Sequence, residues 1–112
     1  YGAATANDTR ILVADGTSNT FTVDREGDVS ANSLSLNYSA QTIATDLSGV
    51  TASVISVNND QTISALPTGS DGKIIYIINA GTGAVTITGH GTIAAGKVAT
   101  LVAVGTTWYR VN

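Results

Sequence analysis

Two runs of large apolar residues, 73–79 (KIIYIIN) and 98–104 (VATLVAV), most constrain the fold of this chain. Both contain many β-branched residues, which favour strands, and both are apolar at successive positions. Because neighbouring side chains of a strand point to opposite faces, each run needs cover on two sides. A second sheet of the same domain can cover one side. The other side needs a further layer, most simply another subunit.

The rest of the chain also favours strands over helices. No apolar repeat with the period of a helix is present, and the one candidate helical turn, 40–48, is weakened by β-branched Thr and Ile. Short apolar stretches separated by Gly and Asn predict strands near 9–14, 19–24, 27–37, 50–57, 61–66, 73–79, 83–88, 92–95, 97–104 and 106–111. We therefore expect an all-β fold that associates with copies of itself: an N-terminal extended arm or hairpin, then a small antiparallel β-sandwich knob.

The N-terminal part has too few large side chains to bury itself. Asp15-Gly16 is typical of a hairpin turn, and farther along the apolar phase slips near Asn32-Ser33. After this slip, Leu34, Leu36 and Tyr38 share one face, and we expect them to form a trimer interface.

This contrast between the two halves also predicts the domain organisation. We expect an extended arm over residues 1–40, a connector over 41–49 and the knob over 50–112.

The composition limits the classes of partner. Only 12% of the 112 residues are charged, against about 25% in an average soluble domain. This low fraction fits either an extracellular β-domain with a hydroxyl-rich surface or a surface hidden against copies of the same chain. The net charge is −3, so nucleic acid is not an expected partner. The absence of cysteine excludes a disulfide framework, and no apolar run has the length of a membrane span. The first residue is Tyr, so we expect a piece of a longer polypeptide.

Several motifs of residues 61–112 occur in a characteristic order. They are Leu66-Pro67, Gly72-Lys73 before an apolar strand that ends at Asn79, Gly-Thr-Gly at 81–83, Val-Thr-Ile-Thr at 85–88, Ala-Gly-Lys at 95–97 and Gly-Thr-Thr-Trp-Tyr at 105–109. Together they resemble a C-terminal β-domain of fibre, spike and decoration proteins of tailed bacteriophages. Residues 9–37 resemble shaft segments of the same proteins. The resemblance implies a virion structural protein, typically homotrimeric, with no counterpart of a family catalytic residue.

The sequence offers little for catalysis or metal binding. His90, the single histidine, lies between two glycines, which hold an imidazole poorly. We expect an exposed turn residue, and the alternative is a metal on a three-fold axis, bound by one imidazole from each chain. Asp24, Glu26 and Asp28 predict a solvated loop, the alternatives being a calcium site or a glycosidase pair. We expect neither enzymatic activity nor a cofactor.

The two adjacent aromatic residues near the C-terminus should differ in environment. On one strand Trp108 and Tyr109 point to opposite faces, so we expect Trp108 in the core and Tyr109 exposed or at an interface.

Contact with a receptor is expected in grooves between subunits or at loops, because loops project from sheets and vary without harm to the core. The candidate loops are 68–72, 79–83, 89–91 and 105–107. Their hydroxyl and amide groups suit a neutral saccharide. The candidate receptor-binding residues in these loops are Asp71, Asn79, Thr82, His90 and Thr106.

We thus expect a fibre or spike fragment at the virion surface, on a tail or head fibre, whose partners are its own copies and host cell-surface polysaccharide. The alternatives are a capsid decoration or trimerisation cap without ligand, and a secreted monomeric carbohydrate-binding module. Neither nucleic acid nor a membrane is an expected partner.

Overall fold

The computed structural model describes residues 21–23, 26–31, 33–41, 45–58 and 60–112, and the chain divides into two units, Tyr1–Ser35 and Leu36–Asn112. The described part of the first unit contains a two-stranded antiparallel sheet of β1 (Phe21–Val23) and β2 (Val29–Ala31). Gly27 lies between them with a φ of 89°, which an L side chain rarely adopts. The predicted hairpin across Asp15-Gly16 lies outside the described residues.

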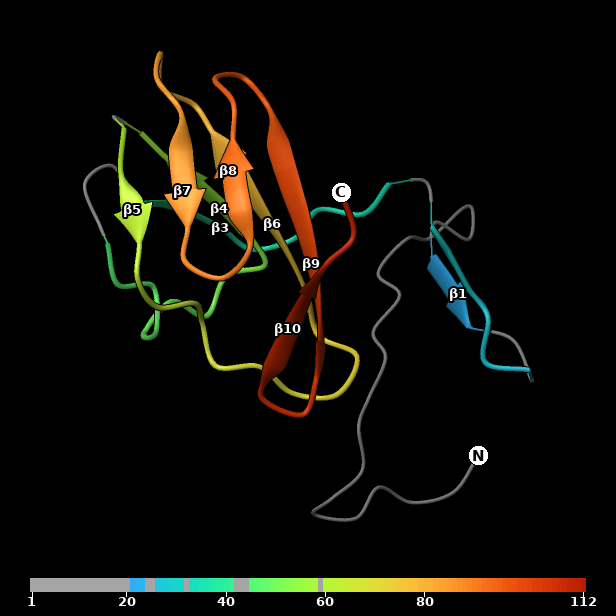
Figure 1. The fold of residues 1–112 in the computed structure, drawn as a ribbon. Helices are drawn as coiled ribbons and strands as arrows, with labels where there is room; N and C mark the ends of the chain where they lie inside the picture. Colours follow the sequence, from blue (N-terminus) through green and yellow to red (C-terminus); the bar gives the residue numbers. More distant parts are fainter. Residues whose placement is uncertain (1–20, 24–25, 32, 42–44, 59) are drawn as a thin grey trace. The chain divides into compact units, whose positions relative to one another are not determined.

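The second unit contains two sheets and, among its described residues, no helix. The five-stranded sheet has the order β10-β9-β6-β4-β3 and consists of β3 (Tyr38–Gln41), β4 (Val54–Val57), β6 (Ile74–Asn79), β9 (Val98–Val104) and β10 (Thr107–Arg110). The three-stranded sheet has the order β5-β7-β8 and consists of β5 (Thr62–Ile63), β7 (Val85–Ile87) and β8 (Gly91–Ile93). Figure 1 shows β7 and β8 in front of the strands of the larger sheet. The prediction of an all-β fold is confirmed for the residues that the structure describes.

Strand direction differs from the expected antiparallel arrangement. β3 pairs with β4, β4 with β6 and β5 with β7 in parallel, whereas β6, β9 and β10 and the pair β7–β8 are antiparallel. The chain passes from one sheet to the other after β4, β5, β6 and β8, and an isolated parallel bridge joins Asp46 to Ala65, two residues beyond β5. The connecting segments 42–53 and 58–73 supply the dozen or so residues that a parallel crossover needs. The expected antiparallel pattern is thus corrected for β3, β4 and β5.

One apolar core joins the two sheets. In β6 and β9 every second side chain is buried, as the period of a strand requires. The core consists of Leu47, Ile55, Val57, Ile63, Ile75, Ile77, Val85, Ile87, Ile93, Ala99, Leu101, Ala103 and Trp108. Each buried Ile, Leu or Val contributes roughly 1.5–3 kcal/mol relative to an exposed one. Trp108 is in this core and donates its indole N–H to the carbonyl oxygen of Pro67 (2.8 Å), whereas Tyr109 is 57% exposed, so the predicted split is confirmed.

The opposite face of the five-stranded sheet, called here the outer face, is apolar and lies away from this core. By strand register it carries Tyr38, Ala40, Val54, Ser56, Ile74, Tyr76, Ile78, Val98, Thr100, Val102, Val104, Thr107 and Tyr109, none of them charged. Val104 is 63% exposed, and Tyr76 and Val102 are half-buried. Within the described residues of the second unit, the two apolar runs are covered by this core on one side only.

The outward side of the smaller sheet differs in chemistry. Thr62, Thr86 and Thr92 lie side by side across its three strands, while Ile63, Val85, Ile87 and Ile93 point into the core. A row of threonines is a surface suited to water, so the two sheets present contrasting outward faces.

The start of the second unit precedes the predicted start of the knob at residue 50. Tyr38–Gln41 is the edge strand β3 of the five-stranded sheet, because its pairing with β4 continues the sheet. Within the described part of the chain we find no helix long and apolar enough to cross a lipid bilayer.

Candidate functional site

The predicted receptor-binding residues separate to the two ends of β6. Asp71 and Thr106 lie near its first residue, where the Gly105 N–H donates to Asp71 Oδ1 (2.5 Å) and ties the two loops together. Thr82 lies in the loop that follows the last residue of β6. Asp71, Thr82 and Thr106 are all exposed, but one chain does not bring them into a single site.

Asn79 is not available to a ligand. Its side chain is fully buried and donates to the carbonyl oxygens of Gly83 (2.7 Å) and Ile93 (2.9 Å), while its Oδ1 accepts from the Gly81 N–H (3.0 Å). These bonds use both amide hydrogens and the carbonyl oxygen of the side chain. The expected role in receptor binding is therefore corrected for Asn79: it joins the β6–β7 loop to the end of β8.

His90 lies in the tight turn between β7 and β8. Its N–H donates to the Ile87 carbonyl oxygen (2.9 Å), and both flanking glycines have a φ near 80°, at 80° and 83°. Arg110 Nη1 donates to the carbonyl oxygens of His90 (2.8 Å) and Thr92 (2.9 Å), which attaches this turn to the end of β10. The backbone of His90 thus makes the bonds that hold this turn, and its imidazole is half-buried.

The acidic residues considered for metal binding fall only partly within the described residues. Glu26 and Asp28 are exposed beside Gly27 in the turn between β1 and β2, and Asp24 lies outside the described residues. Among the residues that are described, no group of three or more His, Cys, Asp or Glu side chains is arranged to hold a metal ion.

The predicted interface residues are exposed in the single chain. Leu34, in the first unit, is 79% exposed, and Leu36 and Tyr38, in the second unit, are 40% and 61% exposed. Tyr38 lies on the outer face, where its hydroxyl is 2.7 Å from Ser56 Oγ. This contact fixes Tyr38 at the β3 end of the outer face.

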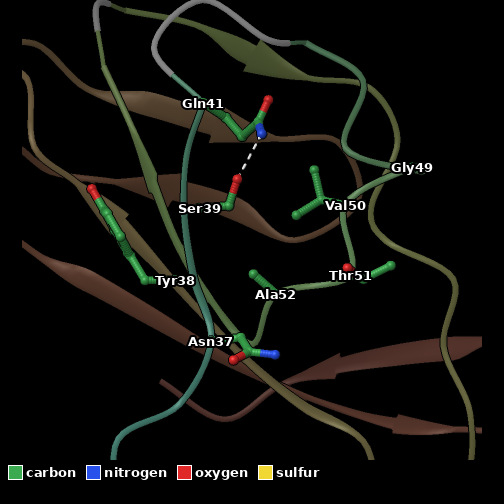
Figure 2. A pocket seen from close by; sticks show the side chains of 8 residues that line it. All are labelled: Asn37, Tyr38, Ser39, Gln41, Gly49, Val50, Thr51 and Ala52. Carbon is green, nitrogen blue, oxygen red and sulfur yellow. Dashed lines mark hydrogen bonds between the residues drawn. The ribbon is translucent and has the colours of Figure 1, made fainter.

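A pocket that the sequence did not predict lies between β3 and residues 49–52. It is open to solvent, has a volume of about 360 Å³ and is lined by Asn37, Tyr38, Ser39, Gln41, Gly49, Val50, Thr51 and Ala52 (Figure 2). Gln41 Nε2 donates to Ser39 Oγ (2.8 Å) along one wall. None of the lining residues is charged, so the pocket offers amide and hydroxyl groups beside the aliphatic side chains of Val50 and Ala52.

The wall opposite β3 is held by a hydrogen-bonded turn. Leu47, fully buried in the core, accepts at its carbonyl oxygen from the Val50 N–H (2.9 Å). Before it, the Ser48 hydroxyl and the Ser48 N–H donate to the Asp46 carboxylate and hold the pKa of Asp46 below its ordinary value. This wall is thus positioned by the core and by local bonds.

The sequence signals this pocket only through two polar residues of β3, which depart from the apolar pattern on the core-facing side of the sheet. Ser39 pairs with Ile55, and Gln41 pairs with Val57, so both polar residues are on the core-facing side of β3. This departure is visible only once β3 is placed beside β4, which the sequence pattern did not do.

Comparison of the chain with protein-family models, with curated proteins and with solved structures finds no match.

Proposed function

We propose that this chain is a virion structural protein of the fibre or spike class, which assembles as a homotrimer at the virion surface and attaches to host polysaccharide. The observation that carries the proposal is the apolar, uncharged outer face of the five-stranded sheet. The three-fold symmetry and the virion location come from the sequence resemblance to phage fibre proteins.

The outer face supports self-association through its position and its chemistry. It extends over all five strands, and it includes exposed Val104 and Tyr109 as well as exposed Ile74 and Val98. Contiguous apolar surface of this kind marks an interaction site, because its removal from water is favourable. A chain of net charge −3 repels its own copies, and an uncharged face is where two copies can approach at least electrostatic cost.

The outward side of the smaller sheet differs from the outer face of the five-stranded sheet. It carries the hydroxyl groups of Thr62, Thr86 and Thr92 in place of apolar side chains. Only one of the two sheets therefore presents an apolar surface for another subunit.

Attachment to a polysaccharide is supported by the neutral, hydrogen-bonding character of the exposed groups. Thr82 and Thr106 in the loops, and the amide and hydroxyl groups of the β3 pocket, can both donate to and accept from sugar hydroxyls. In a trimer, three weak sites act together on one polymer, so that modest affinity at each site suffices.

The test of assembly is the mass of the protein in solution. Light scattering at micromolar concentration should give about three times 11.3 kDa for the wild type. Val102→Asp, on the outer face, should give a monomer, because it places a charge in the buried interface. The matched control Thr86→Asp, on the threonine row, should remain trimeric. A wild type that is a cooperatively folded monomer, or a trimeric Val102→Asp, would contradict the proposal.

Binding to an array of bacterial surface polysaccharides separates the proposal from its alternatives. The proposal expects a trimer that binds at least one polysaccharide. A trimer that binds none would favour a capsid decoration or trimerisation cap, and a monomer that binds would favour a secreted carbohydrate-binding module.

A further inference from the structure

We infer that the pocket between β3 and residues 49–52 is a subsite for one neutral sugar ring, recognised through a pair of neighbouring hydroxyl groups. The inference rests on the proposed attachment to polysaccharide and names its site. It places the sugar away from the loops at 68–72 and 105–107, which the sequence alone favoured.

The first argument is the position of Ser39 and Gln41 in the sheet. Across the sheet, Ser39 continues the row Ile55, Ile77 and Ala99, which is buried throughout. Ser39 and Gln41 are half-buried, so two core-facing positions of β3 have polar side chains where the neighbouring strand has Ile55 and Val57. Apolar side chains there would extend the core, and their absence leaves the pocket.

The second argument is the hydrogen-bonding capacity that these two side chains present. The bond from Gln41 Nε2 to Ser39 Oγ uses one amide hydrogen of Gln41 and one lone pair of Ser39. A second amide hydrogen, an amide oxygen and a hydroxyl hydrogen belong to the same small cluster. Because a sugar hydroxyl both donates and accepts, two adjacent hydroxyls complement such a cluster.

The third argument is the apolar surface beside this cluster. Figure 2 shows the Val50 side chain directed to the same space as Ser39 and Gln41, with Ala52 below it. Val50 packs against the core, and Ala52 is buried. The methyl groups of half-buried Val50 can contact the C–H face of a sugar ring while the polar wall binds its hydroxyls.

Size and charge agree with this class of ligand. The volume of about 360 Å³ lies at the lower end of the range of roughly 300–1,000 Å³ for small-molecule sites, which suits one or two sugar rings. No lining residue is charged, so a phosphate or carboxylate ligand would have no ion-pair partner among the residues that line the pocket.

The experiment uses the 112-residue protein and free sugars as probes: methyl glucoside, methyl galactoside, methyl mannoside and N-acetylglucosamine. Saturation-transfer NMR detects binding, and amide shift mapping on the wild type locates it without any substitution. We expect shifts at residues 37–41 and 49–52. Ser39→Ala and Gln41→Leu should each weaken binding by about tenfold, the effect of one lost hydrogen bond. The matched control Thr62→Val, on the threonine row of the smaller sheet, should leave binding unchanged. Thr106→Val tests the loop that competes with the pocket, and a sugar bound in the pocket should not respond to it.

The outcomes separate this inference from the proposed function. Shifts at the loops, with loss of binding in Thr106→Val alone, would overturn the pocket and leave attachment in place. A trimer that binds none of the four probes would overturn the pocket as a neutral-sugar subsite, and the polysaccharide array then decides attachment itself. Circular dichroism melting of Ser39→Ala and Gln41→Leu tells loss of a ligand contact from loss of the fold.

Discussion

Asn79 illustrates at the scale of one residue why turn chemistry does not reveal burial. An Asn that ends an apolar strand before a Gly-rich loop suggests an exposed turn, and sequence analysis therefore placed Asn79 at the surface. The Gly96 N–H donates to the Asn79 carbonyl oxygen, and the Asn79 N–H donates to the Lys97 carbonyl oxygen (both 2.9 Å). The turn that precedes β9 therefore lies against Asn79. Contacts between segments distant in sequence decided its burial, and no local pattern encodes them. The split between Trp108 and Tyr109 was predictable because it depends only on strand alternation.

Asn79→Ala should lower the free energy of unfolding by about 2–4 kcal/mol, because it removes the amide that donates to the part-buried carbonyl oxygen of Gly83 and to the buried carbonyl oxygen of Ile93. Denaturant unfolding at matched protein concentration measures the difference. Thr82→Ala is the matched control: it truncates an exposed residue of the same loop and should cost less than about 0.5 kcal/mol. Equal effects of the two substitutions would show that the bonds of the Asn79 side chain are not important for stability.

At the scale of the strands, the positions of most elements in the second half were predictable, but their partners were not. The predicted strands at 73–79, 83–88 and 97–104 match β6, β7 and β9 because periodicity and glycine turns are local. Strand direction is not local, since a strand has the same alternation in parallel and antiparallel pairs. For this reason β3, which pairs with β4 across a crossover, was assigned to the arm. The pocket beside β3 was missed with it.

The observed strand order predicts a gradient of hydrogen exchange. β6 has β4 on one side and β9 on the other, so its amides should exchange among the slowest in the protein. The amides of β3, at the edge of the sheet, should exchange faster than those of β6. Exchange followed by mass spectrometry of peptic peptides measures this difference. Equal protection of β3 and β6 would contradict β3 as a free edge in the assembled protein, and would instead indicate that another strand pairs with it.

At the scale of the whole molecule, we propose two apolar surfaces for contacts between chains. One is the outer face of the five-stranded sheet, and the other is the stripe predicted from the sequence, Leu34 in the first unit and Leu36 and Tyr38 in the second. Tyr38 belongs to both, because it ends the outer face at β3. The low charge of the chain and its double-sided strands predict a surface shared between chains, and this stays a prediction. The register of the sheet adds which residues lie together on the outer face.

Replacement of both Leu34 and Leu36 by Asp tests the stripe independently of the outer face. Both leucines are exposed in the single chain, so the double substitution should leave the fold of one chain intact. It should weaken trimer assembly by about 3 kcal/mol or more, because two apolar contacts are lost and two charges are moved from water into an interface. Light scattering over a concentration series measures the shift toward monomer. Val29→Asp is the control, since Val29 is 62% exposed on β2 and lies outside the stripe. A double variant with the mass and melting temperature of the wild type would exclude the stripe from the interface and leave the outer face as the surface that holds the trimer together.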